Sequence, residues 1–271
     1  MLKGFYLTLL IGPAVPAPAP QTVVDALESV QVTSSTDRGG FQLTFGVSKN
    51  SPLLTTLLPA GYFDPVITRV IIIATVGGVP QVLMDGMMTQ QELSPGSEPG
   101  QSTLTLTGED LSVLMDVVEM PFARYPGMNS AARVLVALSK YAVFGIVPVV
   151  VPPIFLDTPI PTKRIPTQTG TDRAYIKRLA ALNGQVFYVE PGPAPGANIA
   201  YWGPDIRIPI PQPALNVNMD AHTNVESLSF RLDGLAKKIT VLNIFDPVTE
   251  KITIQIPLPN ISLLRPPLGA R

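Results

Sequence analysis

The sequence contains no cysteine and only one histidine among its 271 residues. Without cysteine, the chain has neither a disulfide framework nor a thiolate metal site. A Ser-His-Asp triad would have to use His222, which lies in a polar stretch before a predicted strand. The sequence also has no nucleophile elbow of the G-x-S-x-G type. We therefore interpret His222 as a surface or turn residue.

Charged side chains are scarce as well. They make up 14% of the chain, whereas ordinary soluble domains have about 25%, and this favours a surface that is covered by partners. The formal net charge of -1 gives no general attraction to nucleic acid or to an anionic membrane. The most apolar internal stretch, residues 142–156, is shorter than the roughly 20 residues that span a bilayer, and three prolines interrupt it. We predict no nucleic-acid partner and no membrane insertion.

Two pairs of carboxylates have the residue types that glycoside hydrolysis requires. Glu109 and Asp110 lie where a helix is predicted to begin, and acids are expected there in any case. Glu226 and Asp233 are separated by a strand and a turn. No calcium loop, zinc spacing or glycine-rich phosphate motif is present in the sequence. We predict no catalytic residue, no cofactor and no metal site, and keep a cell-wall hydrolase as a weaker alternative.

The sequence is rich in residues that make turns and short strands. Thirty prolines and twenty-one glycines are spread between runs in which apolar and polar residues alternate, and such runs are typical of strands. The run from Val66 to Val76 is apolar on both faces. The predicted hairpins join residues 28–32 to 41–47, 66–76 to 81–88, and 237–244 to 251–259.

Three helices are predicted between the two β sections. Asn183 and Gly184 end the third in left-handed geometry, and strands at 185–190 and 198–203 follow it. Residues 145–169 are proline-rich and have no period, so we expect an extended connection that lies on a neighbouring chain. The predicted helices span residues 109–120, 130–144 and 172–182, with N-caps at Thr107, Asn129 and Thr171. Their expected buried faces include Leu111 and Val118, Val134 and Leu135, and Tyr175 and Leu182.

Four side chains are candidate contacts with a partner. Arg173, Lys177 and Arg178 lie off the apolar stripe of the third helix, on a face that is either solvated or in contact with phosphate or an acidic partner. Tyr201 and Trp202 are adjacent in a strand and face opposite sides, so one is expected in the core. The other is of the type enriched at interfaces, and Trp202 is taken as the fourth candidate.

The first 20 residues allow two interpretations. An early Lys3, an apolar run from Phe5 to Ile11 and the small residues after it resemble a cleaved signal peptide. The run is short, however, and Gly12 and Pro13 break it. The alternative is an edge strand followed by a proline-rich arm.

The predicted fold is a β-rich α+β fold with two small related β-barrels, joined by helices and a proline-rich extended connection. Residues 26–32 resemble residues 224–230, since both have Glu-Ser followed by alternating apolar positions and both open a β section. The predicted parts are an N-terminal strand or arm (1–20), a first β-barrel with a helix (21–120), a helical and extended connector with a β-hairpin (121–204), and a second β-barrel (205–271).

Residues 171–204 as a whole resemble a segment of the hub proteins of contractile phage tails and related injection systems, which include the late-control D proteins. The amino-terminal part of type VI secretion spike proteins is similar. Residues 40–45 and 105–116 also resemble first-barrel segments of these proteins. The shared pattern is an acid, an aromatic residue, a helix with leucine, Asn-Gly and an aromatic strand, matched here by Asp172, Tyr175, Leu179, Asn183, Gly184, Phe187 and Tyr188.

The resemblance implies a structural role without an active site. Such hubs are homotrimers with two similar barrels in each chain, so that six barrels form a pseudo-sixfold ring. One face of the ring meets the hexameric tail tube protein and the other meets the trimeric spike protein. The implied location is the tail baseplate of a virion or phage-tail-like particle, assembled in the bacterial cytoplasm, with other baseplate components as further partners.

Two alternatives remain beside a separate hub. The sequence has no oligonucleotide-binding-type barrel or repetitive needle after its last hairpin, so the 271 residues are either a hub with a separate spike or the hub-like N-terminal part of a longer spike fusion. The other alternative is a secreted all-β binding module, which would use Tyr201 or Trp202 as an exposed aromatic platform.

Overall fold

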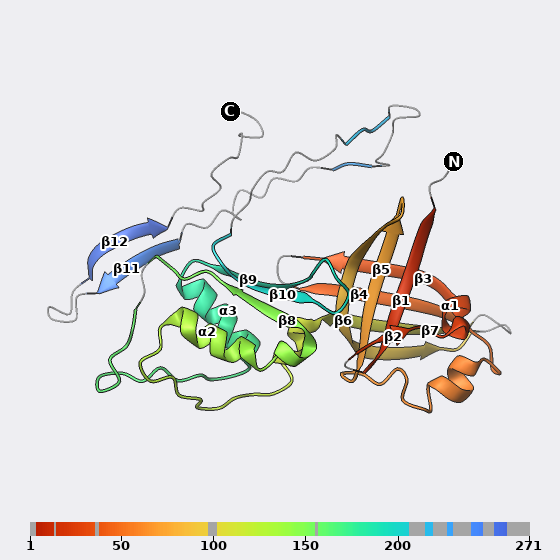
Figure 1. Ribbon diagram of the computed structural model, residues 1–271, viewed down its shortest axis with the longest axis horizontal. Helices are drawn as coiled ribbons and strands as arrows, with labels where there is room; N and C mark the ends of the chain where they lie inside the picture. The colour runs from red at the N-terminus through yellow and green to blue at the C-terminus, as the bar shows by residue number, and fades with distance from the viewer. Residues whose placement is uncertain are drawn as a thin grey trace. The chain divides into compact units, whose positions relative to one another are not determined.

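The computed structural model describes residues 4–13, 15–35, 38–96, 102–154, 157–205, 215–218, 227–229, 240–245 and 252–258. The chain divides into two compact units, Met1–Gly203 and Pro204–Arg271 (Figure 1). Strands outnumber helices in the described residues, as predicted.

Seven strands of the first unit form one antiparallel sheet in the order β2-β1-β5-β6-β7-β4-β3. The first predicted hairpin is confirmed as β3 and β4, and the second as β5 and β6. The strands are β1 (Phe5–Pro13), β2 (Ala17–Pro18), β3 (Leu27–Ser34), β4 (Gly39–Val47), β5 (Thr68–Val76), β6 (Val79–Ser94) and β7 (Ser102–Asp110).

Strand β5 lies in the interior of this sheet, between β1 and β6, and is buried on both faces from Thr68 to Ala74, as its apolar run predicts. Gly77 and Gly78 make the turn to β6 with φ angles of 60° and 87°. Two positive φ angles in a two-residue turn match the twist of the flanking strands. On the other side, β1 pairs with β5 along all nine of its residues. The apolar run near the N-terminus is therefore a strand of the sheet.

The sheet bends around a single core but is open. Figure 1 shows β3 and β4 crossing β1 and β5, and Leu9 of β1 and Phe45 of β4 belong to the same cluster of buried side chains. The two edge strands, β2 and β3, follow one another in the chain, and helix α1 (Gln21–Ala26) connects them and buries Val23 in that core.

Within the described residues no pairing joins β2 to β3, so the predicted first barrel is an open sheet. Strand β2 has only two residues, and Pro18 has no N–H group to donate to a further strand. The π-helix η1 (Leu53–Leu57) covers the core between β4 and β5, with Leu53 and Phe63 buried.

A second layer of the first unit has its own core. Strands β8 (Ile146–Val150), β9 (Val186–Pro191) and β10 (Asn198–Gly203) form a sheet in the order β8-β10-β9, with β8 parallel to β10. Its core includes side chains of the helices α2 (Ser130–Ser139) and α3 (Asp172–Leu182) and of the 3-10 helix η2 (Leu111–Met115). A further 3-10 helix, η3 (Ala142–Phe144), precedes β8.

The predicted helix 109–120 is wrong. Strand β7 continues to Asp110, which pairs with Gly86 of β6, and only five residues of 3-10 helix follow. The N-cap is Asp110, whose side chain accepts a hydrogen bond from the backbone N of Ser112. Leu111 is buried as expected, but Val118 is exposed.

The other two predicted helices are confirmed with changes at their ends. Asn129 caps α2 and Thr171 caps α3, each by accepting a hydrogen bond from a backbone N–H three residues later. Helix α2 ends at Ser139, five residues before its predicted end. Leu135 and Leu182 are exposed, in contrast to the prediction.

The proline-rich stretch 145–169 lies on its own chain. Its beginning is strand β8, and Gly145 before it has a φ of 77°. Its end runs beside residues 119–125, with Arg124 bridged to Thr167. Parallel pairing with β10 satisfies backbone groups of β8 within the chain. The expectation that the stretch also lies on a neighbouring chain stays a prediction.

In the second unit, the structure describes one hairpin. Strand β11 (Thr240–Phe245) pairs antiparallel with β12 (Ile252–Leu258), as predicted. His222, Glu226 and Asp233 lie outside the described residues. The prediction of a second barrel at 205–271 stays a prediction.

Candidate functional site

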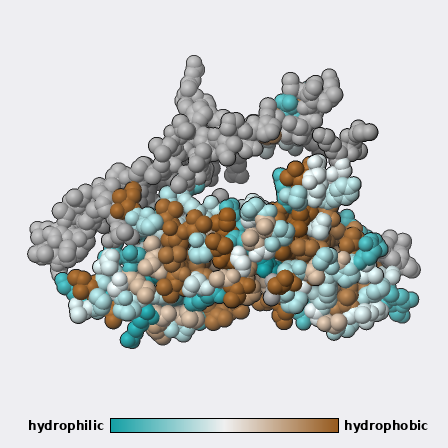
Figure 2. All heavy atoms as spheres, viewed as in Figure 1, coloured by the Kyte–Doolittle hydropathy of each residue, from teal (hydrophilic) through white to brown (hydrophobic). Residues whose placement is uncertain are grey.

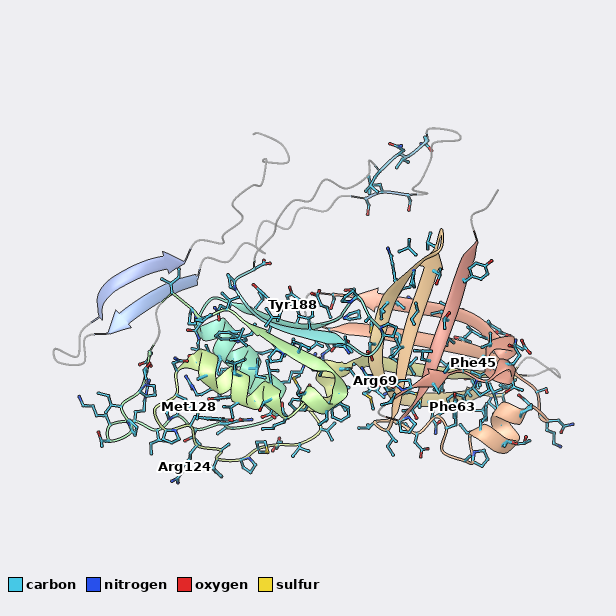
Figure 3. All side chains as sticks on the ribbon, in the orientation of Figure 1. Phe45, Phe63, Arg69, Arg124, Met128 and Tyr188 are labelled. Carbon is cyan, nitrogen blue, oxygen red and sulfur yellow. The ribbon has the colours of Figure 1, made fainter. Side chains whose placement is uncertain are left out.

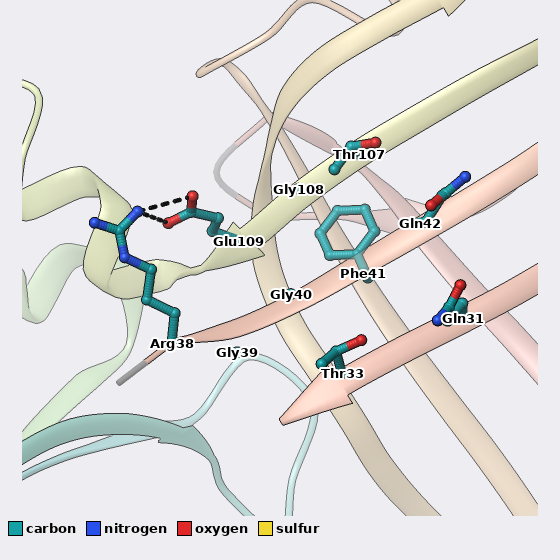
Figure 4. Close-up of a pocket in the computed structure, with 10 residues that line it drawn as sticks. All are labelled: Gln31, Thr33, Arg38, Gly39, Gly40, Phe41, Gln42, Thr107, Gly108 and Glu109. Carbon is teal, nitrogen blue, oxygen red and sulfur yellow. Dashed lines mark hydrogen bonds and ion pairs between the residues drawn. The ribbon is translucent and has the colours of Figure 1, made fainter. Parts of the chain in front are cut away.

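A shallow hollow of about 340 Å³ lies over β3, β4 and β7 (Figure 4). Gly40 of β4 stands opposite Thr33 of β3 and Glu109 of β7, and its missing side chain leaves the space open. The next row of the sheet places Gln31, Gln42 and Thr107 side by side. The hollow thus offers amide and hydroxyl groups and a single ion pair.

The acid of that ion pair is Glu109, one of the carboxylates considered for catalysis. Arg38 Nη1 lies 3.2 Å from Oε1 and 3.3 Å from Oε2 of Glu109, and Arg173 Nη1 lies 3.7 Å from Oε2. The neighbouring Asp110 is buried and accepts hydrogen bonds from the backbone N of Gly39 at 2.5 Å and of Ser112 at 2.9 Å. Both carboxylates thus make contacts within the chain, and of the two only Glu109 lines the hollow.

Two of the four candidate partner contacts lie in the interior. Arg173 is 2% exposed, and its Nη1 lies 2.9 Å from Oδ2 of Asp116. Arg173 lies off the apolar stripe of the helix, as expected from the sequence. Its contact with Asp116 at the end of η2 could not be predicted, because the two residues are far apart in the chain. Trp202 is fully buried, with its Nε1 3.4 Å from the carbonyl oxygen of Ile176.

The other two candidates lie nearer the surface. Arg178 is exposed, and its guanidinium lies 5.3 Å from the centre of the Tyr175 ring while Nη1 donates to Oγ1 of Thr169. Lys177 is half-buried. Tyr201 faces the side opposite Trp202, as predicted, and is stacked on Tyr188 with 5.2 Å between ring centres.

Asp172 lies at the centre of a buried polar network. Its carboxylate accepts hydrogen bonds from Lys140 Nζ at 2.8 Å, from the Tyr141 hydroxyl at 2.8 Å and from Gln168 Nε2 at 2.6 Å. Burial and the hydrogen bond to Asp172 raise the pKa of Tyr141. Asp172 therefore connects α3 to the turn after α2 and to the segment that precedes α3.

Tyr125 extends the same network. Its hydroxyl donates to Oε1 of Gln168 at 2.5 Å, and its ring is stacked on that of Tyr175 with 5.8 Å between centres. Burial raises the pKa of Tyr125, and the nearby Tyr175 and Asp172 add to this effect. Two residues of the resemblance, Asp172 and Tyr175, are thus buried and make contacts within the chain.

An exposed aromatic residue at Phe122 could not be predicted from the sequence. This side chain is 73% exposed, and its φ of 63° is rare for a residue with a side chain. Val117 and Val118 nearby in the chain are also exposed. We call Val117, Val118 and Phe122 the apolar knob.

The backbone under the knob is held firmly. Met120 N donates to the Gly170 carbonyl at 3.1 Å, and Phe122 N donates to the Gln168 carbonyl at 3.0 Å. On the return side, Gln168 N donates to the Ala123 carbonyl at 2.8 Å. The backbone at Phe122 is therefore held by hydrogen bonds on both of its sides.

Other large apolar side chains are exposed as well. Figure 2 shows brown patches on the face turned to the viewer. Strongly exposed examples are Tyr6, Val79, Val143, Ile154, Ile160 and Leu182. Single exposed apolar residues are normal on the surface of a monomer. This chain exposes many of them, in agreement with its low content of charged residues.

Among the residues that the structure describes, no group of three or more His, Asp or Glu side chains is placed to hold a metal ion. No helix in that part of the chain is long and apolar enough to cross a membrane.

No model of a known protein family matches the sequence, and no curated protein matches it. Among solved structures, the chain is similar to the tail protein from Neisseria meningitidis MC58, with 13% identity, a TM-score of 0.45, and coverage of 73% of this chain and 51% of that chain. It is similar to the 43 kDa tail protein of prophage MuSo2 from Shewanella oneidensis, with 12% identity, a TM-score of 0.47, and coverage of 73% and 53%. It is also similar to a chain of the lidded Francisella PdpA–VgrG complex, with 12% identity, a TM-score of 0.46, and coverage of 90% and 34%.

Two of these structures are described as tail proteins, the class of protein that the sequence resembles. The chain spans about half the length of each tail protein and about a third of the PdpA–VgrG chain. With TM-scores below 0.5, no residue role is transferred from these structures to this chain.

Proposed function

We propose that this protein is a structural baseplate hub that joins the hexameric inner tail tube to the trimeric spike of a contractile tail or injection particle. It acts as a homotrimer without enzymatic activity. Its partners are its own copies, the tail tube protein, the spike protein and other baseplate components. Its location is the tail baseplate, after assembly in the bacterial cytoplasm.

The observation that carries this proposal is the apolar knob. Phe122 is an exposed aromatic side chain on a hydrogen-bonded backbone, and two exposed valines lie four and five residues before it in the chain. Aromatic side chains of this kind serve as anchors when an interface buries them. The hollow over β3, β4 and β7, in contrast, is lined by no histidine or lysine that could activate its threonine hydroxyls, and its one acid is paired with arginine. Contact with other proteins therefore fits the surface better than chemistry on a substrate.

The ring geometry and the chain divisions are part of the same proposal. Residues 205–271 form a second barrel related to the β1–β7 sheet, so that three chains supply six similar units. Contacts within such a ring are heterologous, because each chain presents two different surfaces to its neighbours. Among the candidate partner contacts, Lys177 and Arg178 remain in this role. Arg173 and Trp202 are buried, and the apolar knob takes their place.

Sedimentation velocity of the wild type and of Phe122→Ser tests the role of the knob. We expect a trimer for the wild type and a shift toward monomer for Phe122→Ser at the same concentration. Leu182→Ser is the control, because it removes an exposed apolar side chain from the end of α3. A trimer that is equally stable in all three proteins would exclude the knob from the contact between chains.

A further inference from the structure

The first unit contains two separate cores. One lies within the sheet β1–β7 and includes Phe45 and Phe63. The other is formed by residues after 110, and of the described residues before that point Met87 alone contributes a fully buried side chain to it. We call residues 4–110 the sheet half and residues 111–203 the helix half. Ile71 and Ile73 of β5, on the same face of the strand as Arg69, are also buried and belong to neither core.

A buried polar cluster crosses the same junction. Arg69 of β5 and Asp85 of β6 form a bidentate pair, with Nε to Oδ1 and Nη2 to Oδ2 both at 2.7 Å. The side chains of both residues are almost wholly buried. From the helix half, Asn198 Nδ2 donates to Asp85 Oδ2 at 2.8 Å, and the Gly196 carbonyl accepts from Arg69 Nη2 at 3.3 Å. Figure 3 shows Arg69 between the half with Phe45 and Phe63 and the half with Tyr188.

Within the helix half, backbone contacts with Gly145 fix the positions of Gly196 and Asn198. Asn198 N donates to the Gly145 carbonyl at 2.8 Å. A Cβ atom on Gly145 would overlap the Gly196 carbonyl oxygen, and the φ of Gly145 is 77°. Only glycine fits this close approach, and it sets the position of Gly196 and Asn198 relative to β8.

From these contacts we infer that Arg69, Asp85 and Asn198 form a latch that fixes the orientation of the two halves. Apolar contact is non-directional and allows many relative orientations. The two crossing hydrogen bonds, from Asn198 to Asp85 and from Arg69 to the Gly196 carbonyl, each involve a charged group that the Arg69–Asp85 pair holds in place, and they allow few. When the crossing bonds are lost, the halves reorient about the connection between β7 and η2 while each core stays folded. The latch does not depend on the proposed assembly.

The chain is well suited to a direct test, because it has no cysteine and one tryptophan. Spin labels on Ser29→Cys in β3 and Ser139→Cys in α2 report the distance between the halves, since both positions are exposed. Trp202 is buried in the core of the helix half. A blue-shifted Trp202 emission shows that this half is folded in each variant.

Two variants open the latch in different ways. Asn198→Ala removes the shorter of the two crossing hydrogen bonds and leaves both the Arg69–Asp85 pair and the bond from Arg69 to the Gly196 carbonyl. Arg69→Met with Asp85→Leu replaces the pair by apolar side chains, an exchange that proteins often tolerate. Arg164→Met is the matched control, because Arg164 pairs with Asp157 at the surface of the helix half.

Pulsed electron paramagnetic resonance gives the distance distribution. We expect one narrow distribution for the wild type and for Arg164→Met, and at least a twofold broader distribution in both latch variants with Trp202 emission unchanged. Wild-type widths in both latch variants would overturn the latch. A red shift of Trp202 in Asn198→Ala would overturn it too, because Asn198 would then be needed for the core itself.

Discussion

The hydroxyl of Tyr141 donates a 2.8 Å hydrogen bond to Oδ2 of Asp172 and so joins the turn after α2 to the first residue of α3. Lys140 Nζ reaches the same oxygen at 2.8 Å. Two helices that are far apart in the sequence thus share one buried carboxylate. A partly buried hydrogen bond to a charged group stabilises a protein by about 1.5–3 kcal/mol.

Tyr141→Phe should therefore lower the free energy of unfolding by about 2 kcal/mol. Asp172 keeps its bonds to Lys140 and Gln168 in this variant, so the fold should persist. Urea denaturation at pH 8 measures the difference. No change in the midpoint would contradict a structural role of the Tyr141–Asp172 bond.

The same bond predicts a loss of stability in alkali. Burial and Asp172 raise the pKa of Tyr141 above its ordinary value, which is about 10 in the unfolded chain. The folded state thus holds the proton more tightly, so this contribution is complete below pH 10 and is lost as the pH rises through the folded-state pKa. Between pH 8 and pH 11, the wild type should lose more stability than Tyr141→Phe. Parallel curves for the two proteins would contradict this.

Gly108→Ala should destabilise the sheet by about 1–3 kcal/mol through overpacking. A Cβ atom at Gly108 would overlap the ring of Phe41, which is directly opposite in β4. Gly40→Ala is the matched control on the neighbouring strand, because its Cβ would meet only the Gly108 carbonyl oxygen at 3.4 Å. Thermal unfolding of the two variants should differ clearly, and equal melting temperatures would contradict the packing described for Phe41.

Strand β1 should be required for the stability of the sheet. Ile11 is buried in the core of the sheet half, whereas Val15 is almost wholly exposed. Ile11→Ala should lower the free energy of unfolding by about 2–4 kcal/mol, and Val15→Ala should leave it nearly unchanged. Equal stability of the two variants would contradict the pairing of β1 with β5.

Phe122→Gly should separate stability from assembly. Phe122 is exposed and has a positive φ, so glycine removes little buried surface and relieves the backbone strain. The melting temperature of the dissociated chain should stay the same or rise, while the trimer becomes weaker. A large drop in the melting temperature at low protein concentration would show that Phe122 packs against its own chain.

The hairpins could be predicted from the sequence because alternating apolar residues and glycine turns are local signals. The buried Arg69–Asp85 pair is also visible in the sequence, because each residue is a single charged residue within the apolar run of a predicted strand. Charges in that setting are rarely buried unless they are paired. Strands in one hairpin bring such charges together.

Other features depended on contacts between distant segments. Residues 107–110 resemble a helix start, but pairing with β4 and β6 keeps them in β7. Arg173 looked solvated because Asp116 comes from another element. The exposure of Phe122 had no local signal, because it results from the pairing of residues 119–125 with 166–171.

The native mass of the purified protein tests the central claim most directly. Light scattering at several concentrations, with the intact mass of the chain measured alongside, should give a particle of three times 29.0 kDa made of full-length chains. A monomer of 29.0 kDa at every concentration would contradict the trimeric hub. A monomer that lacks its first ~19 residues would also contradict it and would favour the secreted binding module.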